Sequence, residues 1–169
     1  MKIMAAIPFF WVLVLSGCHV ANDEISNPED LLYNKVLHAI RIQNQNIITD
    51  SEYDQVVGYI SKGGSKWVAL YPKLKSTPFY GETSFQEGLN ISMAYSLSHN
   101  PSETLQFVDK DNIGSICGIP FIEPTNNEIY TYYLKTRTAI ASKAAESPWA
   151  EKCLLQLEKS MESMNSLSE

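Results

Sequence analysis

The stretch Asn-Pro-Glu-Asp-Leu-Leu-Tyr-Asn-Lys-Val-Leu-His-Ala-Ile, residues 27–40, carries the pattern that decides the fold. Asn27 suits a helix N-cap, and Pro28 suits the first helical position, where no backbone N–H is needed. Two acidic residues follow in the first turn, at the positive end of the helix dipole. Apolar residues then recur three and four positions apart, so the stretch predicts a helix over residues 29–44.

Helix-start signals recur through the rest of the chain. Ser, Thr or Asn repeatedly stands three residues ahead of Glu, which is the spacing of a capping box. Pro72 is expected to kink or shorten one of the resulting helices. We predict helices that start near residues 50, 65, 84 and 101, a long helix over 127–146 and a last helix over 149–163.

Signals for strands are missing from the sequence. The chain holds no Asp-Gly or Asn-Gly dipeptide, and no segment alternates cleanly between apolar and polar residues. Residues 116–122 are apolar but are interrupted by Gly and Pro, which favours a short buried turn or a 3₁₀ segment. The predicted fold class is all-α, with about six to seven short helices in a bundle or a small α-solenoid.

Residues 1–17 have the features of an export signal. Lys2 provides a positive start, and residues 3–15 form an apolar run of 13 residues. A membrane-spanning helix needs about 20 apolar residues, whereas this shorter run suits the hydrophobic region of a secretory signal. We therefore expect residues 1–17 to be removed on export.

The signal ends in Leu15-Ser16-Gly17-Cys18, which resembles the lipobox of bacterial lipoproteins. The resemblance implies cleavage before Cys18 and anchoring of the product through acyl chains such as palmitate. In such lipoproteins an Asp after the lipidated Cys favours inner-membrane retention, so His19 implies the outer membrane, with the protein facing the periplasm. The alternatives are a plain signal peptide with a chance cysteine, or a buried apolar helix.

The mature product is acidic. Only Lys2 among the charged residues leaves with the signal, so 12 basic residues face 19 acidic ones and the net charge is −7. This balance excludes general binding to nucleic acid, which needs excess Lys and Arg. The predicted organisation is a signal peptide over 1–17, a lipidated Cys and tether over 18–27, one helical domain over 28–164 and a frayed tail over 165–169.

Two cysteines remain after lipidation, Cys117 and Cys153. An even pair in an oxidising compartment predicts one disulfide. Two free buried thiols, or a redox or metal site, are the alternatives, although the chain has no C-x-x-C motif.

No motif in the sequence predicts catalysis. None of the three histidines, His19, His38 and His99, stands in a metal-ligand or catalytic spacing. The nucleophile elbow G-x-S-x-G and a phosphate-binding Gly-rich loop are missing as well. We therefore expect no catalytic residue, no metal and no cofactor.

The richest group of polar and aromatic residues falls on the helix predicted over 127–146. Tyr130, Tyr133 and Arg137 share one face of that helix, and residues 129, 132 and 136 share another. Tyr and Arg suit an interface, so the first face is the candidate surface for binding a partner or a glycan. The favoured alternative places the rings of Tyr130, Tyr132 and Tyr133 in the core of the domain.

The features together predict a lipid-anchored periplasmic binding protein without catalysis and with a protein partner. Its small size, acidity, helices and disulfide resemble those of the immunity proteins that protect bacteria against envelope-acting toxins. The alternative is an assembly or structural lipoprotein of the outer membrane; a hydrolase ranks third. An acidic surface also speeds encounter with a basic partner.

Overall fold

The computed structural model describes residues 27–76, 83–121 and 124–166, and within these ranges the chain forms helices and no strand. The all-α prediction is confirmed. Six of the described helices are longer than a single turn. The helices are α1 Pro28–Ile42, η1 Gln45–Ile47, α2 Asp50–Ser61, α3 Ser65–Val68, α4 Tyr71–Ser76, α5 Thr83–Leu97, α6 Pro101–Thr104, η3 Leu105–Phe107, α7 Ile113–Ile116, α8 Asn126–Ala141 and α9 Ala150–Ser166.

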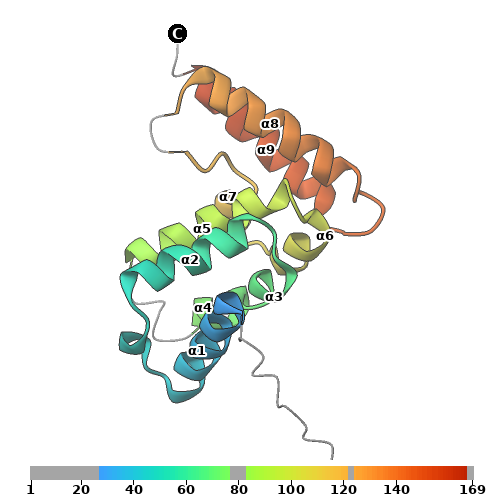
Figure 1. Ribbon diagram of the computed structural model, residues 1–169. Helices are drawn as coiled ribbons and strands as arrows, with labels where there is room; N and C mark the ends of the chain where they lie inside the picture. Colours follow the sequence, from blue (N-terminus) through green and yellow to red (C-terminus); the bar gives the residue numbers. More distant parts are fainter. Residues whose placement is uncertain (1–26, 77–82, 122–123, 167–169) are drawn as a thin grey trace, which may run out of the picture.

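The helices form three successive layers (Figure 1). The α8–α9 pair lies at one end of the molecule, α1 and α4 lie at the other, and α2 and α5 lie side by side between them. Helix α5 is central, because it packs against α2 on one side and against α6, α7 and α8 on the other. None of the helices in the described ranges has both the length and the apolar content that a bilayer span requires.

The central position of α5 explains its unusual composition. Its apolar residues Leu89, Met93 and Leu97 are at most 2% exposed, as their four-residue spacing predicts. Ser92 and Ser96 are also buried, and each donates its hydroxyl to a backbone carbonyl of the same helix. Ser96 donates to the Met93 carbonyl at 2.9 Å and lies 2.6 Å from the Thr104 hydroxyl, which ties α5 to α6. A helix buried on several sides needs such internal partners.

The disulfide between Cys117 and Cys153 is present, which confirms the predicted pair. It joins the residue after α7 to the first turn of α9, and both cysteines are fully buried. Of the turn predicted over 116–122, Ile116 belongs to the single helical turn of α7, residues 117–121 are non-helical, and residue 122 lies outside the described ranges. The bond attaches the α8–α9 layer to the rest of the domain.

The predicted effect of Pro72 is confirmed: the helix expected from residue 65 breaks between α3 and α4, and Pro72 lies in the first turn of α4, where a missing N–H is tolerated. Other predicted helix boundaries were wrong. Helix α8 ends at Ala141 rather than 146, because the backbone N–H of Lys143 donates to the Ile140 carbonyl in a tighter turn. Helix α5 begins one residue before Ser84, and α9 extends to Ser166, inside the predicted frayed tail.

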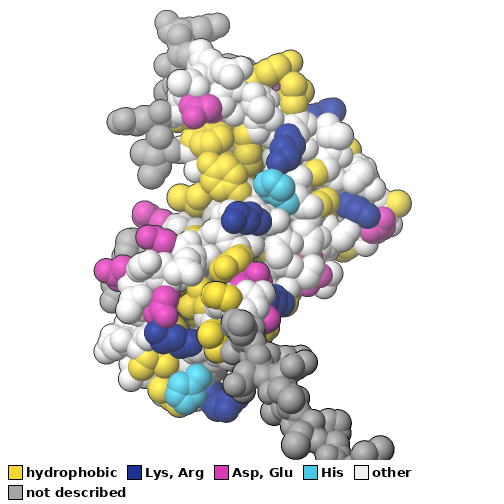
Figure 2. Space-filling model, in the orientation of Figure 1, with side chains coloured by type: hydrophobic (Ala, Val, Ile, Leu, Met, Phe, Trp, Pro, Cys, Tyr) yellow, Lys and Arg dark blue, Asp and Glu magenta, His cyan; other side chains and the backbone are white. Residues whose placement is uncertain are grey.

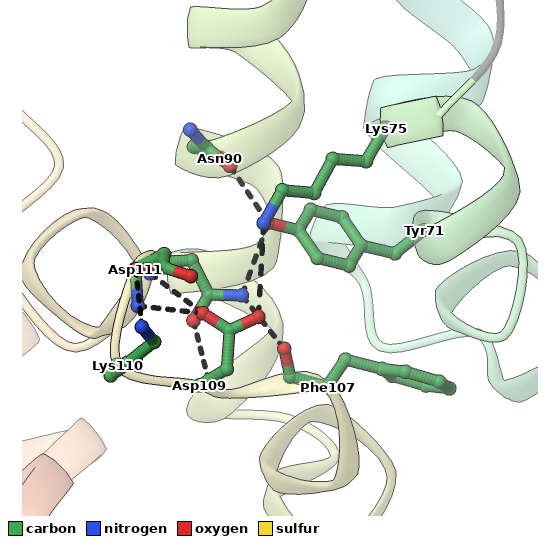
Figure 3. Close-up of polar contacts among 8 residues, drawn as sticks. Tyr71, Lys75, Asn90, Phe107, Asp109, Lys110 and Asp111 are labelled. Atoms are coloured by element: carbon green, nitrogen blue, oxygen red, sulfur yellow. Dashed lines mark hydrogen bonds and ion pairs between the residues drawn. The ribbon is translucent and has the colours of Figure 1, made fainter.

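The turn over residues 107–112 makes polar contacts with α4 and, through Tyr71 of α4, with α5 (Figure 3). The buried Asn112 donates to the Phe107 carbonyl at 2.8 Å and to the Tyr71 hydroxyl at 3.4 Å. Tyr71 in turn donates to Asn90 on α5 at 3.1 Å. Asp109 accepts backbone N–H groups of the same turn, so its carboxylate is a structural element of the turn.

An ion pair ties α1 to the start of α2. Thr49 and Glu52 form a capping box, and Lys35 on α1 donates to Glu52 at 2.6 Å. The hydrogen bonds from Lys35 and Thr49 lower the pKa of Glu52 to about 2.

We expect this lowered pKa to make Glu52 a source of acid sensitivity. A carboxylate with a depressed folded-state pKa stabilises the fold above its unfolded pKa of about 4.5 and loses that contribution as the pH falls toward 2. The stability advantage of the wild type over Glu52→Gln, measured by urea unfolding, should be full at pH 7 and vanish near pH 2. Glu162→Gln, at an exposed site on α9, is the control. A pH-independent difference for Glu52→Gln would contradict this assignment.

Candidate functional site

Helix α8 separates the two predicted faces. Ile129, Tyr132 and Thr136 are buried, whereas Tyr130 is 54% exposed and Arg137 is exposed. Tyr133 is intermediate and packs against the core. The core interpretation is therefore confirmed for Tyr132 and wrong for Tyr130, and the candidate binding face has Tyr130 and Arg137 at the surface.

The outward face continues from α8 onto α9. Arg137 donates to Glu158 of α9 at 3.4 Å, across the seam between the two helices. Leu134, one turn from Tyr130, is 44% exposed, and Leu155 of α9 is 60% exposed. This outward face of Tyr130, Leu134, Arg137 and Leu155 carries large apolar side chains that the core does not use.

A groove lies on another side of α8, between its first half and the end of α5. Its volume is about 430 Å³. The lining residues come from the last turn of α5 and the residues after it, from Phe121, and from the first three turns of α8. They are Tyr95, Ser98, His99, Phe121, Asn127, Glu128, Thr131, Tyr132 and Lys135.

Three aromatic rings form the floor of this groove. Tyr95, Phe121 and Tyr132 contact one another edge to face, with ring centroids 5.5 to 5.8 Å apart and interplanar angles of 76° to 81°. Each pair has the geometry that aromatic quadrupoles favour. The floor is therefore apolar and is held by mutual packing of the rings.

The hydroxyl of Tyr132 anchors the floor from below. It lies 3.1 Å from the Ala94 carbonyl and 3.3 Å from the Gly118 carbonyl, to which it donates. Burial raises the pKa of Tyr132, and burial together with the charge of Glu128 raises the pKa of Tyr95. Both phenols are thus neutral, and the groove presents ring carbons rather than a phenolate.

The rim of the groove is charged. Lys135 donates to Nε2 of His99 at 2.9 Å, and Nδ1 of His99 lies 3.2 Å from the Tyr95 carbonyl, to which it donates. On the opposite rim, hydrogen bonds from Thr125 lower the pKa of Glu128, which completes the capping box of α8. The upper half of Figure 2 shows a histidine with basic side chains on both sides, next to a hydrophobic area.

The residues that follow α2 lie against the end of α5. A Cβ built on Gly63 would lie 3.0 Å from the Cβ of His99, so the end of α2 touches the end of α5. Neither Lys62 nor Lys135 forms an ion pair with a carboxylate in the part of the chain that the structure describes. Lys62 lies over the Tyr59 ring, whereas Lys135 lines the groove together with His99 and the carboxylate of Glu128.

The remaining candidates do not assemble a second site. His38 lies exposed on α1, and the residues 1–26, with Cys18 and His19, lie outside the described ranges. Within those ranges no three His, Cys, Asp or Glu side chains are close enough to share a metal ion. A further hollow of about 500 Å³ lies against η1, α2 and α5, and its carboxylates Asp50 and Asp54 belong to the first two turns of α2.

The sequence alone did not predict the groove. Tyr95 and Phe121 stand 26 positions apart, and neither has a spacing that relates it to Tyr132. They meet because α5 crosses under α8 and because the segment after Cys117 returns to the same place.

No protein-family model, curated protein or solved structure matches this chain.

Proposed function

We propose that this chain is a lipid-anchored periplasmic protein that binds a protein partner and performs no catalysis. The observation that carries the proposal is the groove between α5 and α8. It combines an apolar aromatic floor with a polar rim of His99, Glu128 and Lys135, and Lys135 forms no ion pair among the described residues. Such a surface, concave and apolar with a few polar groups at its edge, is typical of a binding site.

The compartment is supported by two independent features. The lipobox-like end of the signal, with Cys18, predicts lipidation and attachment to the outer membrane. The buried disulfide Cys117–Cys153 is the kind of bond that persists in an oxidising compartment such as the periplasm. The disulfide also uses both remaining thiols, so neither of them is available as a nucleophile.

The favoured role is inhibition of an envelope-acting toxin, as for periplasmic immunity proteins. The net charge of −7 would speed encounter with a basic toxin at low salt, and the groove would then supply contact at short range. We expect co-expression to protect cells against a toxin encoded beside the gene, with formation of a stable complex. Two results would count against this role. One is that expression of the neighbouring gene alone does not impair growth or viability, and the other is that the chain does not protect cells against it.

A second candidate function is supported by the outward face of α8 and α9. The exposed Tyr130, Leu134 and Leu155 suit docking to a larger envelope assembly. This function predicts co-purification with an outer-membrane complex and an envelope defect on deletion of the gene. It also predicts that Leu134→Asp abolishes the co-purification. The toxin-inhibitor role, in contrast, predicts that a deletion strain without the toxin grows normally.

The anchor is testable by replacing Cys18. We expect radiolabelled palmitate to enter the wild-type chain but not Cys18→Ser, because only the cysteine thiol accepts the lipid. The wild type should fractionate with outer membranes, and the variant should lose its membrane association. Cys117→Ser is the matched control and should keep the label. Labelled Cys18→Ser, or an unlabelled wild type, would refute the anchor.

A further inference from the structure

We propose that the groove between α5 and α8 receives an acidic and apolar segment of the partner protein. A bulky apolar side chain of that segment rests on the floor of Tyr95, Phe121 and Tyr132, and a neighbouring carboxylate binds Lys135. The proposal rests on the proposed function in that it assumes a protein partner, and it specifies the chemistry by which that partner is recognised.

The geometry of the floor favours a side chain over a sugar. A sugar ring stacks on a flat and exposed aromatic face. Here the three rings stand nearly perpendicular to one another, at 76° to 81°, and Tyr132 is only 6% exposed. Ring edges and partial faces surround a hollow instead of forming a platform. A volume of about 430 Å³ is in the range of small ligand sites and accommodates a large apolar side chain with its neighbours.

The charges on the rim indicate why the partner segment would carry a carboxylate beside its apolar side chain. The ammonium group of Lys135 has three protons, of which one is donated to His99 at 2.9 Å, so two remain for a carboxylate. Lys62 does not line the groove, and its ammonium lies 5.9 Å from the centroid of the Tyr59 ring, so Lys135 is the lysine that faces a ligand there. An acidic residue of the partner is attracted to Lys135, and it is repelled by Glu128, which also lines the groove, and by the excess acid of the rest of the mature chain. The carboxylate is therefore expected at the Lys135 end of the groove.

The walls of the groove are held before any partner binds. Tyr132 is fixed by its hydrogen bonds to the carbonyls of Ala94 and Gly118, and Glu128 is fixed in the capping box with Thr125. His99 is fixed between Lys135 and the Tyr95 carbonyl. Preformed walls reduce the conformational entropy lost on binding, which favours recognition of a short segment.

A random phage-displayed dodecapeptide library is the probe that tests the proposal. It would be selected on the full lipidated chain in phospholipid nanodiscs, with empty nanodiscs for counter-selection. We expect enrichment of peptides in which Phe, Trp or Leu stands next to Asp or Glu. Their dissociation constants, measured by biolayer interferometry, should rise at least about tenfold with Thr131→Trp, which fills the groove, and with Lys135→Glu.

Matched variants separate recognition from misfolding. Lys159→Glu makes the same charge change at an exposed site on α9 and should leave binding unchanged. A peptide whose acidic residue is replaced by Lys should bind Lys135→Glu better than it binds the wild type, which a merely unfolded variant would not do. Circular dichroism should show the wild-type helix content in every variant.

Three outcomes would overturn the proposal. One is the absence of enriched peptides with the acidic and apolar motif, and another is binding that neither Thr131→Trp nor Lys135→Glu weakens. The third is displacement of bound peptide by chitotriose, which would assign the groove to a glycan. If an envelope partner still binds Thr131→Trp with wild-type affinity, this inference fails while the proposed function stands; if no partner is found, the proposed function fails.

Discussion

Replacing Trp67 with alanine is expected to lower the free energy of unfolding by about 3–5 kcal/mol, the cost of deleting a large aromatic side chain from a core. Trp67 of α3 is 1% exposed. It stacks on Tyr59 of α2, with centroids 4.9 Å apart, and meets Tyr33 of α1 edge to face at 5.1 Å. Its indole N–H donates to Glu29 at 2.8 Å. One side chain thus connects three helices.

Urea unfolding followed by circular dichroism measures this loss. Trp149→Ala is the matched control, because Trp149 is only half-buried and its described ring contact is with the Lys152 ammonium at 4.5 Å. Trp67→Phe should recover part of the stability through its apolar area, without the bond to Glu29. Equal losses of unfolding free energy for Trp67→Ala and Trp149→Ala would show that Trp67 does not hold α1, α2 and α3 together.

Removal of the disulfide is expected to cost about 3–4 kcal/mol. The bond closes a loop of 36 residues, and the chain-entropy relation gives a cost of this size for such a loop. The double variant Cys117→Ala/Cys153→Ala should therefore unfold at a lower urea concentration than the oxidised wild type. Since α9 would then lose its covalent attachment to α7, the α8 wall of the groove should also become less protected from hydrogen exchange.

Reduction provides the control for the disulfide. Dithiothreitol should destabilise the wild type under conditions that reduce the buried bond, and should leave the double variant unchanged. Alkylation of the denatured, unreduced protein followed by mass spectrometry should find no free thiol at Cys117 or Cys153. Two alkylated thiols in protein isolated from the periplasm would refute the bond.

The local signals of the sequence predicted helix starts well. Asn27 accepts a hydrogen bond from the N–H of Glu29, as its place before Pro28 predicts. The predicted start near residue 50 has the full capping box of Thr49 and Glu52. Helix ends were predicted less well, as at Ala141, because tertiary packing and tight turns decide where a helix stops when no Gly or Pro marks the end.

The candidate site was predicted only in part. Helical spacing correctly separated Tyr130 and Arg137 from Tyr132, because both faces belong to one helix. The groove could not be predicted, since Tyr95, Phe121 and Lys135 come from three separate segments. The same holds for the contact of Lys135 with His99, which are 36 positions apart.

By itself, the sequence determined the helical class, most helix starts and the pairing of two cysteines, because capping, apolar periodicity and cysteine parity act over short distances or by simple count. Its lipobox-like N-terminus predicts an anchored periplasmic product. Only the tertiary structure decided that α5 is the central helix and that its end meets α8 over an aromatic floor. Such contacts depend on how whole helices pack, and apolar side chains attract one another without specifying a partner.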